Sequence, residues 1–238
     1  MHDELESAVA TPGSGVCSSD SPIECRSFYR TAGKRALDIT CSAIGLLVLS
    51  PMLLAVAVLV KLSSKGPVFY SQGRVGRDGR IFQILKFRSM KGGPNRNGPV
   101  ITSAGDGRVT PAGRLLRWSK MDELPQLWNV LTGDMSLVGP RPEHPKYVKN
   151  YTDEQRRVLA VRPGITDIAS IVYRNEEAML AQGSDPEWFY HEVILPHKLS
   201  LNLEYVADIS LLRDLRLILE TIKSLFAPDA ARKPDSHC

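Results

Sequence analysis

A continuous apolar stretch is the strongest pattern in the chain, and it occupies residues 39–60 between Asp38 and Lys61. These 22 residues carry no charge, and a helix of that length, at about 1.5 Å per residue, matches the thickness of a bilayer core. Ser50 and Pro51 stand in its middle. Proline removes a backbone donor and clashes with the preceding turn, while a serine hydroxyl can bond the freed carbonyl. The pattern therefore predicts a membrane helix that breaks at Ser50-Pro51.

Basic residues flank this stretch on both sides. Lys34 and Arg35 precede it, and Lys61 and Lys65 follow it. Because basic flanks favour the cytoplasm, a segment that enters and returns on one membrane face keeps both pairs inside, whereas a single pass places one pair outside. We expect a re-entrant membrane helix over residues 31–65, with a single-pass helix kinked at proline as the alternative.

Shorter β-rich and helical patterns follow. Two β-rich stretches within residues 67–90 flank Asp78-Gly79, a dipeptide favoured in tight turns, and predict a small β-hairpin. Helical spacing over residues 113–130 predicts helices on or near the membrane. A last helical pattern covers residues 209–226, and we expect its apolar stripe to pack on the domain, with an interfacial position as the alternative.

The expected fold class is therefore α+β and mainly helical, with a re-entrant membrane helix-break-helix, a small β-hairpin and interfacial amphipathic helices. Residues 1–30 and 228–238 lack periodicity and predict a flexible N-terminal tail and a C-terminal tail. Residues 91–106, rich in Gly, Pro, Asn and Ser, predict a mobile loop. Residues 66–227 are long enough to form one domain at the membrane surface.

Positive charge is concentrated between Arg74 and Lys120. This segment holds eleven basic side chains against two acidic ones, in a chain whose net charge is only +4. Beside a membrane segment, such a cluster suits anionic headgroups or a polyphosphate ligand, and the two interpretations are compatible.

Asp122 and Glu123 are adjacent carboxylates that follow this basic segment, and Pro125 comes soon after them. On a regular helix they would point about 100° apart, so both address one ligand only where the backbone is distorted, as proline allows. A carboxylate beside basic residues can bind Mg²⁺ or attack phosphorus to form an acyl phosphate. Taken alone, such a pair is more often a solvated surface or a helix N-terminus.

The surrounding motifs give this pair a specific context. The stretches KRALDI, SP, GPVFYSQGRVG, KFRSM, LPQLWNVLTGDMSLVGPRPE and RPGIT, in this order, resemble the bacterial sugar transferases known as small monotopic phosphoglycosyl transferases, over residues 34–226. The resemblance implies transfer of a sugar-1-phosphate from a nucleotide diphosphate sugar, expected to be a UDP-sugar, to polyprenol (undecaprenyl) phosphate. It also implies an initiating role in glycan or exopolysaccharide assembly, on the cytoplasmic face of the bacterial inner membrane.

The resemblance also implies roles for individual residues. Asp122 corresponds to the nucleophile, which forms a covalent aspartyl phosphosugar, and Glu123 to its dyad partner. Mg²⁺ is the expected cofactor, held partly through Asp122. The basic residues at matching positions are Lys86, Arg117 and Arg141, which we expect to bind phosphate oxygens, with surface charge pairing as the alternative for each.

Arg88 is a weaker candidate for phosphate binding. The chain departs from the family pattern at residues 167–175, where the family often has GLAQVNGRN after RPGIT, so the sugar stays unassigned.

The competing function is a non-enzymatic membrane-surface protein that binds anionic lipid or nucleic acid through residues 74–120. It leaves the motif at residues 122–143 unexplained, and aromatic side chains that would stack on bases are few there, so we expect membrane lipids and no nucleic acid as partners. The sequence assigns no oligomeric state.

Overall fold

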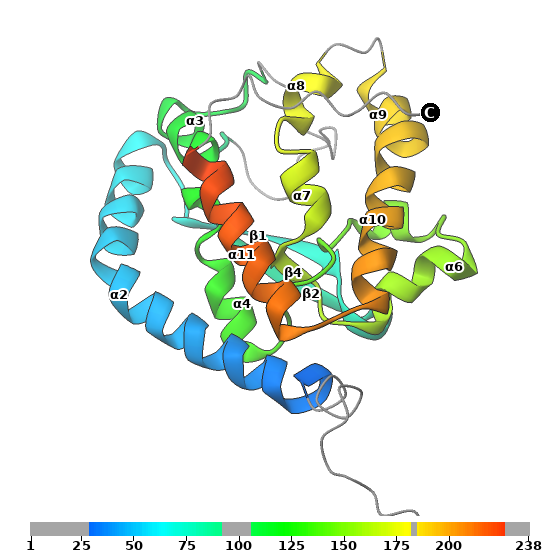
Figure 1. Cartoon of the computed structure of the whole chain (residues 1–238). Helices are drawn as coiled ribbons and strands as arrows, with labels where there is room; N and C mark the ends of the chain where they lie inside the picture. The colour runs from blue at the N-terminus through cyan, green and yellow to red at the C-terminus, as the bar shows by residue number, and fades with distance from the viewer. Residues whose placement is uncertain (1–28, 92–105, 182–184, 227–238) are drawn as a thin grey trace, which may run out of the picture.

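Helices dominate the described part of the chain, residues 29–91, 106–181 and 185–226 of the computed structural model (Figure 1). Two two-stranded sheets, one antiparallel and one parallel, complete it. The expected α+β, mainly helical fold is confirmed, with one sheet more than the sequence pattern predicted.

In chain order, with η marking a 3₁₀ or π turn, the elements are η1 (Tyr29–Gly33), α2 (Lys34–Ser63), β1 (Phe69–Val75), η2 (Arg77–Gly79), β2 (Ile81–Phe87), α3 (Pro111–Trp118), η3 (Met121–Glu123), α4 (Gln126–Thr132), β3 (Ser136–Val138), α5 (Pro145–Val148), α6 (Asp153–Arg156), η4 (Arg157–Ala160), β4 (Gly164–Thr166), α7 (Ile168–Val172), α8 (Glu176–Leu180), α9 (Pro186–Phe189), η5 (Tyr190–Ile194), α10 (Leu195–Ala207) and α11 (Leu211–Phe226).

The predicted tails and the predicted loop over residues 91–106 fall almost entirely outside the described residues. The first described residue, Tyr29, lies within the segment assigned to the N-terminal tail, yet it already belongs to η1 and its side chain is buried. The described helical structure thus already includes residues that precede the apolar stretch.

The apolar stretch forms one helix, α2, which passes through Ser50 and Pro51 without interruption. Pro51 has no N–H for the carbonyl of Leu47, and the Ser50 hydroxyl donates to that oxygen instead, at 2.8 Å. Figure 1 shows α2 bending around one side of the domain, as helices that contain proline do. The predicted helix-break-helix is thus a bend within a continuous helix, because the serine hydroxyl replaces the missing bond.

The middle of α2 presents its apolar side chains outward. Leu47 is 77% exposed and Leu54 is 67% exposed. By length and composition the helix can cross a membrane, and just 11% of its most apolar window is buried inside the protein. Large contiguous apolar surfaces are rare on soluble monomers, so this face is suited to contact with lipid.

Polar side chains fasten the beginning of α2 to the body of the domain. The Arg35 guanidinium donates to the carbonyl oxygens of Val130 and Leu131 at the C-terminal end of α4, at 2.6 and 3.0 Å. The Asp38 carboxylate accepts two hydrogen bonds from β3, one of them from the N–H of Leu137 at 2.9 Å. These bonds satisfy helix-end carbonyls and a strand edge that would otherwise lack partners.

The end of α2 is held by Arg88, which directly follows β2. Its guanidinium donates to the carbonyl oxygen of Ser64 at 2.6 Å and to the carbonyl oxygen of Pro67. Gly66, between them, has φ of +131°, and a Cβ there would lie 2.5 Å from Nη1 of Arg88. Both ends of α2 therefore rest on the same body of the protein.

The predicted hairpin is confirmed. Strands β1 and β2 pair in antiparallel fashion, with Val75 opposite Ile81 at the turn end. Asp78 and Gly79 both have positive φ, 56° and 76°, which is the backbone conformation of the two-residue turns that match strand twist. The side-chain amide of Asn129 in α4 then bonds the β2 main chain on either side of Ile84, so the hairpin is fixed against α4.

Strands β3 and β4 form a short parallel pair that the sequence pattern did not predict. The Gly139 N–H donates to the carbonyl of Thr166, and the Gly164 N–H donates to the carbonyl of Pro140, both at 3.0 Å. A Cβ on Gly164 would lie 2.1 Å from the Gly139 nitrogen. The two glycines thus permit a close backbone approach that joins the GPRP motif to the RPGIT motif.

The helical pattern over residues 113–130 corresponds to three short elements, α3, η3 and α4. Helix α3 begins after Thr110, whose hydroxyl accepts the N–H of Gly113 at 2.9 Å as an N-cap. Lys120 has φ of 57° and separates α3 from η3. The helical period is therefore confirmed, but a left-handed residue divides it just before the carboxylate pair.

Helix α11 confirms the predicted C-terminal helix, yet most of its apolar stripe is exposed and does not pack on the domain. Leu212 is 79% exposed and Leu219 is 57% exposed. The face that packs carries Asp214 and Leu217, both buried, and Lys34 donates to Asp214 Oδ2 at 2.5 Å. The expectation of a buried stripe is wrong because periodicity locates an apolar face without saying what that face contacts.

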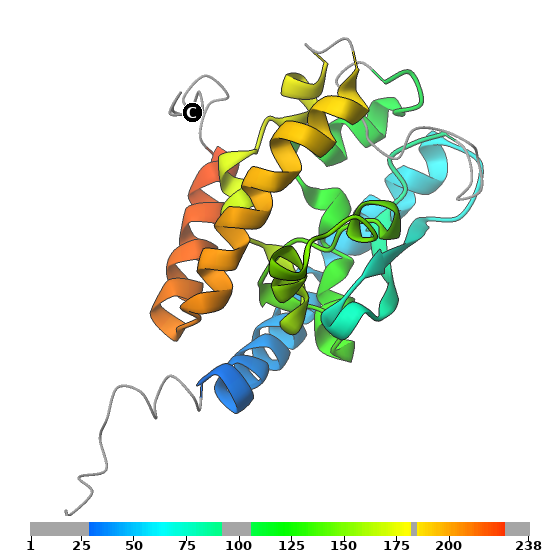
Figure 2. The same ribbon diagram turned by 90° about the vertical axis from the view of Figure 1, so that its right-hand side faces the viewer.

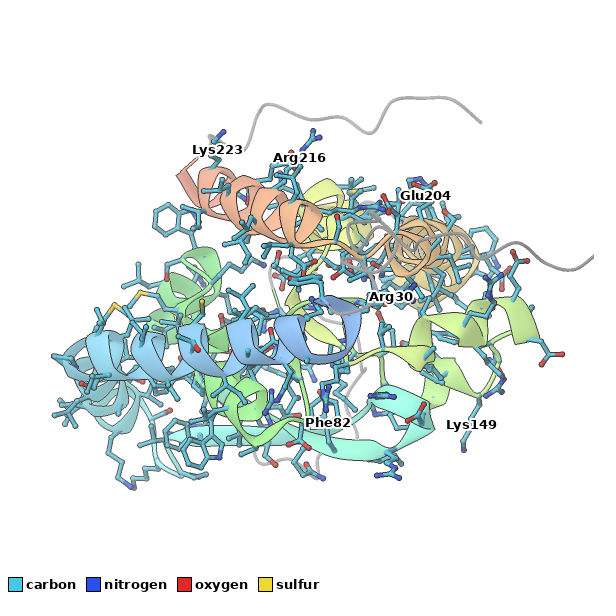
Figure 3. All side chains as sticks on the ribbon, turned by 60° about the horizontal axis from the view of Figure 1, so that its bottom comes forward. Arg30, Phe82, Lys149, Glu204, Arg216 and Lys223 are labelled. Atoms are coloured by element: carbon cyan, nitrogen blue, oxygen red, sulfur yellow. The ribbon has the colours of Figure 1, made fainter. Side chains whose placement is uncertain are left out.

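The views agree on where α11 lies. Figure 2 shows it on the side of the domain opposite the hairpin, and it contacts α7 and the β3–β4 pair. In Figure 3, Arg216 and Lys223 project from it away from the body. The outer face of α11 therefore combines apolar and basic side chains.

Candidate active site

The carboxylate pair lies on η3, a single 3₁₀ turn between α3 and α4. It is entered through the left-handed Lys120, and Pro125 sits at the start of α4. The backbone distortion that the sequence pattern required is therefore present on both sides of the pair. Asp122 is 5% exposed and the Glu123 side chain is 13% exposed, so neither carboxylate is a solvated surface group.

Two cations hold Glu123, and we call Lys86 and Arg141 the cation clamp. The Lys86 ammonium, on β2, donates to Oε1 at 2.7 Å. The Arg141 guanidinium donates to both carboxylate oxygens, with Nη1 at 3.2 Å from Oε2. Burial alone would raise the pKa of Glu123, but the charges of Arg141 and Lys86 outweigh it and hold this pKa well below its usual range.

Asp122 has a different environment one residue away. Its Oδ1 atom is buried and accepts no hydrogen bond from any residue that the structure describes. Burial, and then the negative charge of Glu123, raise the pKa of Asp122, while Lys86 and Arg117 offset part of this effect. The pair therefore contains one carboxylate bound by two cations and one whose buried Oδ1 accepts no hydrogen bond from the described residues. Different environments of this kind are how two acids in one site take different roles.

Arg141 reaches the pair from the loop that follows β3. Its guanidinium faces Glu123, and the charge of Glu123 raises its already high pKa. Its main-chain N–H donates to Oδ2 of Asp167 at 3.3 Å, and Oδ1 of Asp167 accepts the N–H of Ser170 at 2.7 Å. Sequence reasoning noted Asp167 as a departure from the family pattern but gave it no role, because the β3–β4 pairing that brings it to Arg141 was not visible.

The structure places the remaining candidates at different distances from the pair. The positive charge of Arg117 acts to lower the pKa of Asp122, and the Arg117 guanidinium forms an ion pair with Glu177 of α8. Arg88 is occupied with the end of α2 and does not join the cation clamp. Lys86, Arg117 and Arg141 are therefore gathered around the two carboxylates, whereas Arg88 is not.

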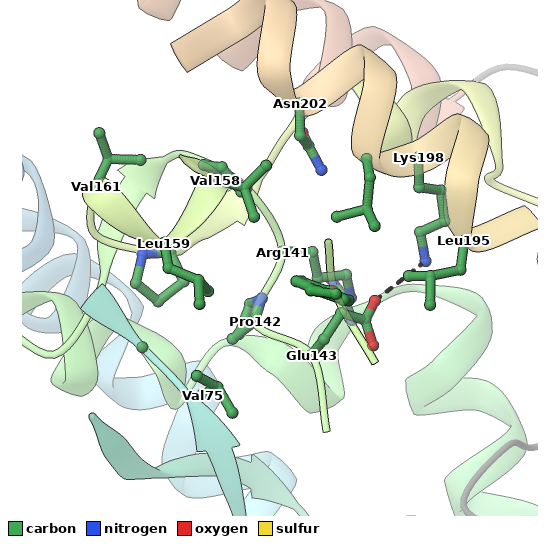
Figure 4. A pocket seen from close by; sticks show the side chains of 15 residues that line it. Val75, Arg141, Pro142, Glu143, Val158, Leu159, Val161, Leu195, Lys198 and Asn202 are labelled. Atoms are coloured by element: carbon green, nitrogen blue, oxygen red, sulfur yellow. Dashed lines mark ion pairs between the residues drawn. The ribbon is translucent and has the colours of Figure 1, made fainter. Parts of the chain in front are cut away.

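A second cluster of charged side chains, formed by Glu143, Glu176 and Lys198, lies next to Arg141. Glu143 accepts from the hydroxyl of Tyr190 at 2.7 Å, and Lys198 lies 3.6 Å from Glu143 and donates to Glu176 at 3.0 Å. Arg141, Glu143 and Lys198 line one cavity of about 20 Å³, which Figure 4 shows between the GPRP loop and α10. The sequence gave no signal for Lys198, which lies on a helix far along the chain.

The donor set around the pair bears on metal binding. Within residues 29–91, 106–181 and 185–226, no group of three or more His, Cys, Asp or Glu side chains could hold a metal ion. Mg²⁺ is commonly held by one or two carboxylates together with substrate phosphates and water. Asp122 Oδ1, buried and without a hydrogen bond from the described residues, fits such a site.

Comparison with known proteins identifies the family of the chain. The family model described as bacterial sugar transferase matches residues 29–228. The chain is 38% identical over 202 residues to the UDP-N-acetylgalactosamine-undecaprenyl-phosphate N-acetylgalactosaminephosphotransferase of Aeromonas hydrophila, covering 84% of this chain and 45% of that protein. It is 38% identical over 203 residues to the UDP-glucose:undecaprenyl-phosphate glucose-1-phosphate transferase of Caulobacter vibrioides, covering 83% of this chain and 71% of that protein.

The protein of the same name from Escherichia coli is 38% identical over 204 residues, with 83% of this chain and 41% of that protein covered. The chain thus spans less than half the length of two of these three relatives. The matched region includes α2, the cation clamp, both carboxylates and α11. The chain belongs to the bacterial sugar transferase family.

Proposed function

We propose that the chain is a phosphoglycosyl transferase that moves a sugar-1-phosphate from a UDP-sugar to undecaprenyl phosphate. The names of its relatives describe this reaction class. The observation that carries the proposal is the contrast within the pair: the cation clamp binds Glu123, while Asp122 is buried and its Oδ1 receives no hydrogen bond from the described residues. A desolvated carboxylate beside gathered cations is suited to attack an anionic phosphorus centre.

The reaction would proceed in two displacements. A carboxylate oxygen of Asp122 forms a bond to the sugar-linked phosphorus, the bond from that phosphorus to the bridging oxygen breaks, and UMP leaves. In the second displacement a phosphate oxygen of undecaprenyl phosphate attacks the same phosphorus, and the acyl phosphate bond breaks to regenerate the carboxylate. The product is a sugar linked to the polyprenol through a diphosphate, which is the initiating intermediate of a glycan.

The gathered cations can bind the donor without losing Glu123. The Lys86 ammonium has three N–H groups and the guanidinium of Arg141 has five, so both keep donors for phosphate oxygens. Arg117 is paired with the half-exposed Glu177, and such pairs contribute little, so a phosphate can replace this partner. Phosphate binding by Arg88 remains a prediction, and the contacts of its side chain are structural ones.

Mg²⁺ is part of the proposal. Asp122 would hold it through a carboxylate oxygen, with the remaining positions filled by phosphate oxygens and water. When bound, the ion offsets charge that develops on the leaving phosphate. The cation clamp meanwhile keeps Glu123 ionised and oriented.

We also propose that α2 enters and leaves the bilayer on one face, with the catalytic domain on the cytoplasmic face of the inner membrane. The support is that Arg35 and Asp38 bind one end of α2 to the body and Arg88 binds the other. A helix held at both ends by one domain cannot place its ends on opposite membrane faces while these bonds last. The exposed Trp118 of α3 and Leu212 of α11 are proposed to lie in the interface.

Cysteine labelling in intact cells tests this topology. With the native cysteines replaced, Arg30→Cys and Lys65→Cys should both resist a membrane-impermeant reagent until the cells are opened. Pro51→Ala should straighten α2 and expose a fraction of position 30. Labelling of position 30 but not of position 65 from outside in the unaltered helix would show a spanning helix instead.

Release of UMP tests the activity itself. The full chain in detergent, with Mg²⁺ and undecaprenyl phosphate, should release UMP from at least one member of a broad UDP-sugar panel, and should show ping-pong kinetics. Asp122→Asn is the matched inactive control. No release from any donor would favour a non-enzymatic protein that binds anionic lipid through residues 74–120.

A further inference from the structure

Asp167 is a buried carboxylate outside the pair, at the end of β4. It is 1% exposed. Each of its two oxygens accepts a main-chain N–H, Oδ1 from Ser170 at 2.7 Å and Oδ2 from Arg141 at 3.3 Å. The first bond caps α7, and any short polar side chain can supply a cap of this kind. The second bond is the unusual one, because it reaches a different segment of the chain.

The second bond continues the β3–β4 pairing into the active site. Main-chain bonds join Gly139 to Thr166 and Gly164 to Pro140, and the regular pairing stops at Val138 and Thr166. Beyond that point the Asp167 side chain takes the place of a backbone acceptor for Arg141. The residue whose guanidinium binds Glu123 is thus held through its own main-chain N–H.

We propose that Asp167 is a positioning residue that fixes the loop of Arg141, so that the guanidinium meets Glu123 and the donor diphosphate in one geometry. The inference rests on the proposed function, because the role of Arg141 toward phosphate comes from it. An isolated buried carboxylate is costly unless hydrogen bonds use its charge, and here one oxygen serves the cap while the other serves the loop. The negative charge of Asp167 also contributes to the raised pKa of Arg141, after that of Glu123.

Two substitutions separate the loop bond from the cap. Asp167→Asn keeps one carbonyl oxygen for the N–H of Ser170 but turns an NH₂ group toward the N–H of Arg141. Asp167→Ala removes both acceptors. If Asp167 positions Arg141, both variants should lose about tenfold to a hundredfold in kcat, since a displacement of about 1 Å can cost a hundredfold, while the KM for the donor changes less than about threefold. If it only caps α7, Asp167→Asn should retain wild-type kcat and Asp167→Ala alone should fall.

Asp185→Asn is the matched control. Asp185 caps α9 by accepting the N–H groups of Glu187 and Trp188, both at 3.0 Å, and it has no part in the cation clamp. It should keep wild-type kcat and KM. Thermal unfolding of all variants, measured in the same detergent, shows whether a loss of turnover reflects a smaller folded fraction.

A double-mutant cycle with Arg141→Lys supplies the decisive readout. Since Asp167 acts through Arg141, Asp167→Asn should cost far less in the Arg141→Lys background than in the wild type. Equal costs in both backgrounds, or a kcat for Asp167→Asn equal to that of the wild type, would overturn the inference. Failure of the proposed function is distinguishable, because it would show as absence of turnover in the wild-type chain itself.

Discussion

The two sides of the η3 turn show how one backbone turn produces two kinds of carboxylate. On one side, Glu123 meets a lysine from the hairpin and an arginine from the β3–β4 loop. On the other side, Asp122 is buried with Oδ1 unbonded by the described residues. The two side chains are nearly the same in chemistry, so the difference comes from what the fold brings to each. In the proposed function, the cation clamp therefore makes Glu123 the fixed partner, and Asp122 is the carboxylate that reacts.

The largest effect should come from Asp122→Asn. An amide cannot form the acyl phosphate, so overall transfer and acceptor-free UMP release should both fall by about 10⁴-fold or more. In the wild type, incubation with donor alone should add one phosphosugar to the intact mass, on the peptide that contains Asp122, and hydroxylamine should remove it. An adduct on Glu123 would reverse the two roles, and a ternary-complex mechanism without an adduct would remove the covalent step.

Glu123→Gln should cost less, about 10²-fold to 10³-fold in kcat. The attacking carboxylate stays, but Lys86 and Arg141 lose the charge that orients them. The phosphosugar adduct should therefore still form, more slowly, and intact-protein mass spectrometry over time measures that rate. Complete absence of the adduct, with the variant folded, would show that Glu123 takes part in the bond-forming step.

Arg141→Lys sharpens the comparison at the cation clamp. Lysine keeps the charge but loses the two-pronged contact with the Glu123 carboxylate, so we expect kcat/KM to fall about tenfold to a hundredfold. Arg141→Ala should fall further. Steady-state kinetics with saturating acceptor measures both variants. Turnover like the wild type in the two together would remove Arg141 from the site.

The smallest effect concerns the pH dependence. Burial and the charge of Glu123 raise the pKa of Asp122, and Asp122 must be ionised to attack. Activity should therefore fall as pH drops through this raised pKa. In Glu123→Gln the neighbouring charge is gone, so the pKa of Asp122 falls and the acid limb of the kcat/KM profile should move to lower pH. An unchanged acid limb would show that another group controls it.

Local signals in the sequence account for several features of the site. The charge-free run identified α2, because a helix long and apolar enough to cross a membrane is recognised by its length and composition. Asp78-Gly79 predicted the hairpin turn, since few residues tolerate two successive positive φ angles. The family motifs then pointed to Lys86, Arg141 and the carboxylate pair.

Other features depend on contacts between distant segments. Asp167 meets Arg141 because β3 and β4 lie side by side, and three-residue strands have too little periodicity to be identified. For α11, the sequence pattern predicted the helix correctly but not which face packs on the domain. Asp214 and Leu217 are buried there, while Leu212 of the apolar stripe is exposed. A helical pattern gives the direction of an apolar face, and the rest of the fold decides whether protein covers it.

The sequence by itself determined which residue types were available: an apolar helix with basic ends, a tight turn, and two adjacent acids after a basic segment. The different environments of the two acids were decided by the tertiary structure. Burial acts to raise the pKa of both Asp122 and Glu123. Arg141, from the loop after β3, and Lys86, from β2, bind Glu123 directly and lower its pKa, whereas the pKa of Asp122 stays raised. Electrostatic effects of this kind depend on the distance between charges in space. That distance is set by how segments far apart in the sequence pack together, which the sequence alone does not show.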